Sequence, residues 1–127
     1  MLGGTLGTAA REGLSLAFPA TGGVAWVIVL INVVGAFILG WLLDGLAARA
    51  HRRHSHTLRL LFATGALGGF TTYSSLAVGT AQLLESGRDL LALAHGVGTV
   101  LLGCLAAWLG LRVASHLRQR SATGRAS

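Results

Sequence analysis

The sequence is short of charge, of cysteine and of proline. Of its 127 residues only 11% are charged, one is a cysteine and one a proline, and lysine does not occur at all. A single cysteine excludes an internal disulfide. Hydrophobic residues make up 53%, which is more than a soluble chain of this length can bury in one core. With 19 glycines and few aromatic residues, the composition favours closely packed transmembrane helices.

The same scarcity argues against other functional classes. The net charge of +6 comes from arginines that cluster outside the apolar runs, and no soluble domain remains to present them to a nucleic acid. The sequence offers no nucleophile paired with a base, no paired carboxylates and no phosphate-binding loop, so we do not expect an enzyme. Its histidines lack the spacing of metal ligands.

Four apolar segments have the length that a helix needs to cross the hydrocarbon core of a membrane. We therefore predict an all-α membrane protein with one four-helix transmembrane domain at 1–117 and a polar tail at 118–127, expected to be disordered. The four segments run approximately over Leu2–Ala20, Val24–Ala48, Thr57–Leu84 and Leu90–Leu117.

Positive charge is concentrated at two places. Eight of the ten arginines flank the loop after the second segment or lie at and beyond the end of the fourth, and only Arg11 and Arg88 lie elsewhere. Since cytoplasmic loops carry the excess of arginine, both termini are expected to face the cytoplasm. Arg11 has Glu12 as its neighbour; adjacent residues do not share a helix face, so each is expected to find a separate partner or reach the interface.

The third segment is interrupted by the run GALGGFTTYSS at 65–75. Its glycines relax the helix, and its hydroxyls can satisfy freed backbone groups or face a ligand. At membrane depth, carbonyls released by such a break can bind a cation, and the amides of the following half-helix favour an anion. A helix kink stabilised by its own Ser and Thr side chains is the structural alternative.

Two further features lie inside apolar helices. Asn32 is the only polar residue of its run and shares a face with Ala36 and Gly40, so its amide either forms a packing hydrogen bond or lines a narrow passage. On the fourth segment, small residues recur at intervals of three and four and can form a packing face, a dimer interface or a pore wall. These residues are Gly96, Thr99, Gly103, Ala106 and Gly110.

The chain resembles the small four-helix fluoride channels of the Fluc type, also called CrcB. The resemblance rests on three motifs in order, with a fourth run similar to the last helix of that family. The motifs are GGTLGTAAR at 3–11, INVVGAFILG at 31–40 and GALGGFTTYSS at 65–75, and the fourth run is GCLAAWLG at 103–110.

This resemblance implies antiparallel dimers with the third helix broken in mid-membrane. A structural sodium ion would lie at the dimer centre, held by the main-chain carbonyls of Gly68 and Thr71. The function implied is passive exit of fluoride from the cytoplasm through the bacterial inner membrane, which reduces fluoride toxicity.

The resemblance also assigns the pore. Asn32 and the hydroxyls of Ser74 and Ser75 would face fluoride, with Tyr73 and Leu76 where the family has phenylalanine. On the fourth helix, Thr99 stands in place of a serine and His95 in place of a tyrosine. Helix packing would rest on Gly96, Gly103 and Gly110.

Homodimers of this antiparallel kind insert one sequence in both orientations, which requires nearly balanced loop charge. Eight arginines on one side favour a single orientation instead, so we hypothesise a partner of reversed bias, an oppositely oriented paralogue, and otherwise a second copy of this chain. A proton-coupled small multidrug exporter, with Glu12 as its carboxylate, and a non-conducting structural subunit are the alternatives.

Overall fold

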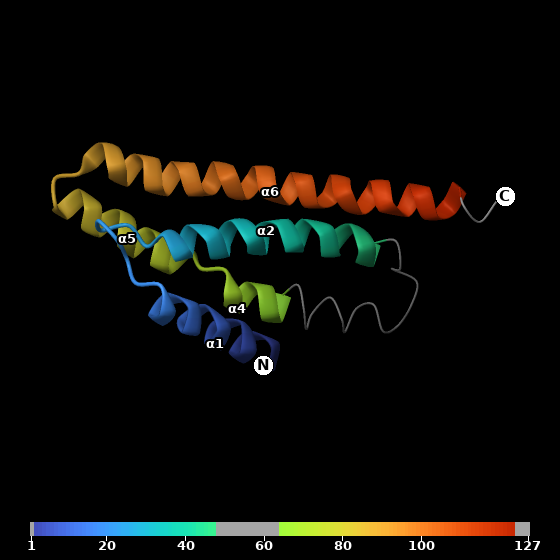
Figure 1. The fold of residues 1–127 in the computed structure, drawn as a ribbon, viewed down its shortest axis with the longest axis horizontal. Coiled ribbons are helices and arrows are strands. Elements are labelled where there is room, and N and C mark those ends of the chain that lie inside the picture. The colour runs from blue at the N-terminus through green and yellow to red at the C-terminus, as the bar shows by residue number, and fades with distance from the viewer. Residues whose placement is uncertain (1, 48–63, 124–127) are drawn as a thin grey trace.

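The computed structural model describes residues 2–47 and 64–123, and the regular structure within these ranges is helical (Figure 1). The predicted start of the third segment, at 57–63, lies outside the described residues. Within the third segment, a π-helical turn at 64–67 leads directly into the helix that begins at Gly68. The named helices are α1 (Leu2–Ala17), α2 (Trp26–Ala47), α4 (Gly68–Phe70), α5 (Tyr73–Glu85) and α6 (Asp89–Thr123).

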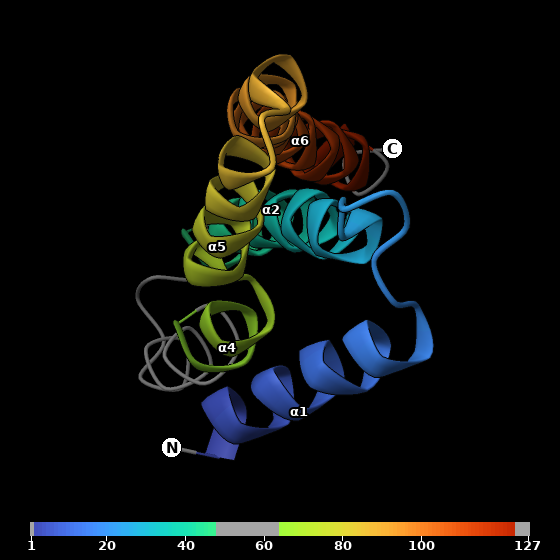
Figure 2. The same ribbon diagram turned by 90° about the vertical axis from the view of Figure 1, so that its left-hand side faces the viewer.

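Successive helices run in alternating directions when α4 and α5, which follow each other in one line, are taken together. In Figure 1, α2 and α6 lie side by side and run the same way, whereas α1 and the α4–α5 pair run the opposite way. Figure 2 shows α1 and α4 together at one end of this arrangement and α6 at the other. The C-terminal ends of α2 and α6 therefore point to one side, and Arg118 and Arg120 lie in the last turns of α6 there.

Within the described part, two helices are long and apolar enough to cross a membrane. They are Trp26–Asp44, with a mean hydropathy of 2.4, and the span Asp89–Arg120, with a mean hydropathy of 2.0. Most residues of both spans lie on the outer surface of the chain. A core helix of a soluble protein would be mostly buried, so these exposed apolar faces favour a lipid environment or a second subunit.

Glycines let α2 and α6 pack backbone against backbone. A Cβ atom at Gly40 would overlap the carbonyl oxygen of Ala107, and one at Gly110 would overlap that of Phe37. Gly103 lies beside Ala36, whereas Gly96 faces Thr80 of α5. Small residues at a helix crossing allow this approach, so the small face of α6 contacts two different helices.

A second backbone contact joins α1 to the segment before the break. A Cβ atom at Gly7 would overlap the carbonyl oxygen of Ala66, and one at Gly69 would overlap that of Gly4. Thr8 adds a hydrogen bond from its hydroxyl to the carbonyl of Gly69, at 3.4 Å. The GGTLG motif of the first helix thus packs directly on the interrupted segment.

The helices differ from the predicted segments mainly at the end of α6. The predicted disordered tail at 118–127 is wrong for 118–123, which continue α6 to Thr123. Arg118 gives one reason, since its guanidinium forms an ion pair with Asp44 of α2 at 3.0 Å and ties this turn to the bundle. The remaining residues, 124–127, lie outside the described part.

Candidate functional site

The third helix line breaks at Thr71 and Thr72. Both residues are extended, with φ/ψ of −75/150° and −146/118°, between the end of α4 and the start of α5. The N–H and the hydroxyl of Thr71 each donate to the carbonyl of Leu67 at 2.9 Å, which closes the turn before the break. Thr72 caps α5 by accepting a hydrogen bond from the N–H of Ser75 at 3.2 Å.

Asn32 of α2 holds the break in place. Its Nδ2 donates to the carbonyl of Thr72 at 3.1 Å, and its Oδ1 accepts from the N–H of Thr72 at 2.8 Å. One side chain therefore bonds both backbone groups of Thr72, the residue at the centre of the break. Gly35, one turn further along α2, leaves room for the methyl group of Thr71, which a Cβ atom there would overlap.

Hydroxyls cluster at the start of α5 and connect to α1. The Thr72 hydroxyl lies 3.0 Å from that of Ser74 and donates to that of Ser75 at 3.2 Å. Arg11 donates to the Ser75 hydroxyl at 3.4 Å. Arg11 thus has the separate partner expected of it, but the expectation is wrong for Glu12, whose carboxylate forms an ion pair with Arg11 at 2.8 Å. Both side chains are long and flexible, so neighbouring positions still allow their ends to meet.

Two hollows flank this polar cluster. The first, of about 260 Å³, is lined by Asn32, Thr72, Tyr73, Leu76 and Thr99, among others. The second, of about 360 Å³, is lined on α1 by Arg11, Glu12 and Ser15 and on α5 by Ser74 and Ser75, together with the start of α2. The hydrogen bond between Thr72 and Ser75 joins the linings of the two hollows.

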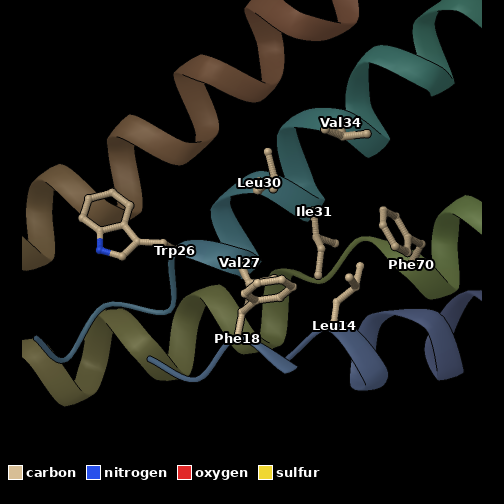
Figure 3. Close-up of a pocket in the computed structure, with 8 residues that line it drawn as sticks. All are labelled: Leu14, Phe18, Trp26, Val27, Leu30, Ile31, Val34 and Phe70. Carbon is tan, nitrogen blue, oxygen red and sulfur yellow. The ribbon is translucent and has the colours of Figure 1, made fainter. Parts of the chain in front are cut away.

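A third hollow, of about 520 Å³, is lined by apolar and aromatic side chains from α1, its following loop, α2 and the end of α4 (Figure 3). Its lining residues are Leu14, Phe18, Trp26, Val27, Leu30, Ile31, Val34 and Phe70. Its lining holds no charged side chain and no hydroxyl, so we place the candidate site at the other two hollows.

His95 and Thr99 are the buried polar residues of α6, with 6% and 4% of their surface exposed. The Thr99 hydroxyl donates to the carbonyl of His95 in its own helix. His95 lines neither polar hollow: its Nε2 packs against Gly79 of α5, 3.3 Å from where a Cβ would stand. Its Nδ1 finds no partner within the described residues.

The predicted sodium ligands lie at the two ends of α4. Gly68 begins this helix and Thr71 follows it in an extended conformation, so the carbonyls of this turn are not used to continue a helix. Residues 2–47 and 64–123 hold no group of three or more His, Cys, Asp or Glu side chains that could bind a metal. Main-chain carbonyls are the donors available at this break, and oxygen donors suit a hard cation such as sodium.

Most of the predicted pore residues come together, although in two groups. Asn32, Tyr73, Leu76 and Thr99 share the first hollow, and Ser74 and Ser75 share the second. Sequence reasoning missed the role of Thr72, which is the residue that Asn32 binds. A threonine directly before a helical run is a typical N-cap and would have singled it out.

The fold and the site together define a class of protein: a helical membrane protein whose broken helix presents polar groups beside an asparagine, as in ion channels and transporters. The family model described as CrcB-like protein, Camphor Resistance (CrcB), matches residues 1–111. The chain belongs to the CrcB family, and the resemblance of the motifs is confirmed.

Curated relatives span nearly the same length. A protein of Leifsonia xyli named fluoride-specific ion channel FluC 2 is 40% identical over 117 residues, covering 91% of this chain and 81% of its own. One of Cutibacterium acnes named FluC 1 is 44% identical over 110 residues, covering 85% and 77%. One of Thermus thermophilus named FluC is 37% identical over 118 residues, covering 91% of each. All three names denote ion channels and none an enzyme.

Proposed function

We propose that this chain is a subunit of a fluoride-selective channel that lets fluoride leave the cytoplasm passively. Its family and the names of its relatives indicate that the transported ion is fluoride. The observation that carries the proposal is the pair of hydrogen bonds between Asn32 and Thr72, which fixes the start of α5 beside a mainly apolar hollow that these two residues help to line. A helix start offers N–H donors and a positive partial charge, and both favour an anion.

Fluoride is strongly hydrated, so a pore must offer donors in place of water. Asn32 has a second N–H that forms no hydrogen bond within the described residues, and Ser74 and Ser75 add hydroxyls one turn away. Thr99 is a poorer donor as it stands, because its hydroxyl proton is given to the carbonyl of His95. It would have to rotate away from that carbonyl to donate to fluoride.

Two features support a second subunit. Tyr73 is 80% exposed although it lines the Asn32 hollow, so its ring extends beyond its own chain. Leu76 stands where the family has phenylalanine, but it has no aromatic ring to offer the pathway. Its side chain is 4% exposed and packed within the chain. We assign the missing ring edges to an antiparallel partner, whose aromatic side chains would close the hollow.

The partner is best explained as an oppositely oriented paralogue. Eight arginines bias the chain toward one orientation, and Asp44 neutralises one of them, Arg118. The other seven still outnumber Arg11 and Arg88, which are expected on the opposite side of the membrane. The relatives named FluC 1 and FluC 2 carry numbers that suggest paired genes. In this arrangement both termini of the chain face the cytoplasm and the protein lies in the bacterial inner membrane.

The assembled dimer would hold one structural sodium ion through the carbonyls of Gly68 and Thr71. Purification with N-methyl-D-glucamine in place of sodium should then shift the complex from dimer to monomer in mass photometry, and added sodium should restore it. Potassium is the control cation. Equal dimer fractions in all three salts would remove the sodium from this proposal without affecting the channel.

Fluoride efflux from liposomes tests the channel. The chain should be nearly silent alone and active when reconstituted with a paralogue of reversed charge bias, with fluoride measured by electrode after valinomycin releases potassium. Robust efflux from the chain alone would overturn the need for a paralogue and retain the channel. Silence in both preparations would overturn the channel.

A further inference from the structure

A hollow of about 250 Å³ lies on the last turns of α6, far along the chain from the break. Its lining alternates between two kinds of residue, apolar side chains and groups that carry or can carry positive charge. The lining residues are Leu109, Arg112, Val113, His116, Leu117 and Arg120.

The basic groups of this hollow follow one row of the helix. Arg112, His116 and Arg120 are four residues apart, which places them on one face of α6 with Leu109 and Val113 beside them. Arg112 also lies over the ring of Trp108, with its guanidinium carbon 4.9 Å from the ring centroid. This contact orients one guanidinium along the helix surface.

Arg118, although close in sequence, does not belong to this row. It lies between His116 and Arg120 in sequence but projects to another face, where its guanidinium binds Asp44 of α2 at 3.0 Å. Arg118 therefore serves the packing of α6 on α2 and does not line the hollow, whereas Arg112, His116 and Arg120 do.

The length of α6 places this row at the membrane surface. With 35 residues the helix is about 52 Å long, and a hydrocarbon core of about 30 Å takes up only its first 20 or so residues. Counted from Asp89, the core ends near Trp108. Tryptophan favours the interface between hydrocarbon and headgroups, so Arg112 and the residues after it reach the headgroups.

We propose that this hollow binds the headgroup of an anionic phospholipid of the phosphatidylglycerol type. The phosphate lies between Arg112 and the next turns of the row, and an acyl chain follows Leu109 and Val113 toward the core. Arginines that line the same hollow suit a phosphate, and the apolar strip beside them suits an acyl chain, which a free phosphate lacks. The site is independent of the ion pathway proposed above.

Trp108 provides a local probe. The chain has three tryptophans, so Trp26→Phe and Trp41→Phe leave Trp108 as the only one. In bilayers that mix phosphatidylcholine with brominated phosphatidylglycerol, quenching of Trp108 should exceed that with the same fraction of brominated phosphatidylcholine. Equal quenching by the two brominated lipids would overturn the proposal.

The charge-matched pair Arg112→Gln and Arg118→Gln separates a site from general attraction. Each removes one arginine from the same helix. Arg112→Gln should lower the preference for the anionic lipid about fivefold, the effect of roughly one basic group near the surface, and Arg118→Gln should leave it unchanged. Equal losses in both variants would show non-specific attraction and overturn the site.

Arg120→Gln repeats the test without touching the contact with Trp108. It should also lower the preference for phosphatidylglycerol, with the fluorescence in unbrominated lipid unchanged. A shift from dimer to monomer in Arg112→Gln or Arg120→Gln, with lipid preference intact, would assign the row to a protein partner and overturn the lipid proposal. Each readout concerns lipid or assembly, so it stands apart from fluoride efflux.

Discussion

Asn32 shows how much one side chain can specify in an apolar helix. Its amide forms the two hydrogen bonds that the peptide groups of Thr72 would otherwise make to the helix. If the break lies at membrane depth, as we propose, no water is available there to replace these bonds, and the break depends on this residue. The sequence alone left Asn32 between a packing role and a pore role, and the structure gives it a packing bond at the edge of a hollow.

Replacement of Asn32 should therefore affect stability as well as transport. Asn32→Ala removes both hydrogen bonds to Thr72 and leaves its N–H unpaired, which should lower the free energy of unfolding by about 1–3 kcal/mol. Thermal unfolding in detergent measures this loss. Wild-type stability in this variant would contradict the structural role.

Asn32→Asp is the companion variant. It keeps an oxygen for the N–H of Thr72 but sets a second oxygen against the Thr72 carbonyl and adds negative charge beside the proposed anion path. Fluoride efflux should fall at least tenfold while the dimer persists, since an energy change of about 1.4 kcal/mol already gives that factor. Unchanged efflux would place the fluoride path elsewhere.

Glu12 separates a channel from a proton-coupled exporter. Its carboxylate is paired with Arg11 at 2.8 Å and its side chain is 56% exposed, so it faces out of the chain. Glu12→Gln removes the charge with almost no change of shape. We expect fluoride efflux within a factor of about two of wild type, since a channel needs no proton carrier and the exposed carboxylate adds little to the pair. A complete loss would favour proton coupling through this residue.

At the scale of elements, the helices fall into two pairs joined by backbone contact. Gly40 and Gly110 lock α2 to α6, and Gly7 and Gly69 lock α1 to the segment before the break. Helices this close have no room for a methyl group at the crossing. Further contacts join the two pairs, since Gly96 of α6 faces Thr80 of α5 and Asn32 of α2 bonds Thr72 at the break.

A pair of glycines on α6 tests this packing. Gly110→Ala places a methyl group against the carbonyl of Phe37, and we expect a loss of about 1–3 kcal/mol in stability as the helices separate. Gly98→Ala is the matched control, since a Cβ there meets nothing within 4 Å. It should be neutral or stabilising by up to about 1 kcal/mol, because alanine is the better helix former.

Detergent-solubilised protein should show this contrast in its thermal midpoint, with the dimer fraction followed in parallel. Equal losses in Gly110→Ala and Gly98→Ala would mean that a subunit interface, not the α2–α6 crossing, sets the response.

The sequence predicted the elements better than their contacts. The apolar runs placed α1, α2 and α6 within a few residues, and the glycines and threonines of the third run placed the break. The link between Asn32 and Thr72 spans forty positions, and no local pattern connects them. The end of α6 was missed because Arg118 reads as part of a polar tail until its partner Asp44 is seen beside it.

The small residues of α6 show the same limit. Their spacing predicted one packing face, yet Gly103 and Gly110 contact α2 and Gly96 contacts α5. Periodicity indicates which residues share a face, whereas the number of neighbours along that face depends on how the other helices cross it.

For the whole molecule, the arginine bias makes a prediction about insertion. Eight arginines against two should give a single orientation, with the C-terminus in the cytoplasm. A C-terminal green fluorescent protein should then be bright and a C-terminal alkaline phosphatase inactive. Replacement of the eight by glutamine leaves only Arg11 and Arg88, so the bias reverses and the alkaline phosphatase should become active. Activity of both on the wild-type chain would support a dimer of identical, oppositely inserted copies.

The two backbone-locked pairs also fix an order of events during synthesis. Gly7 of α1 can contact Ala66 only after residue 66 has been synthesised, and Gly40 of α2 can contact Ala107 only after residue 107 has been synthesised. The first pair can therefore close while the ribosome is still making α6, and α2 remains without its glycine contact until the last helix is inserted. A nascent chain stalled after α5 would already have its broken helix docked on α1, with a groove on α2 kept open for the helix still to come.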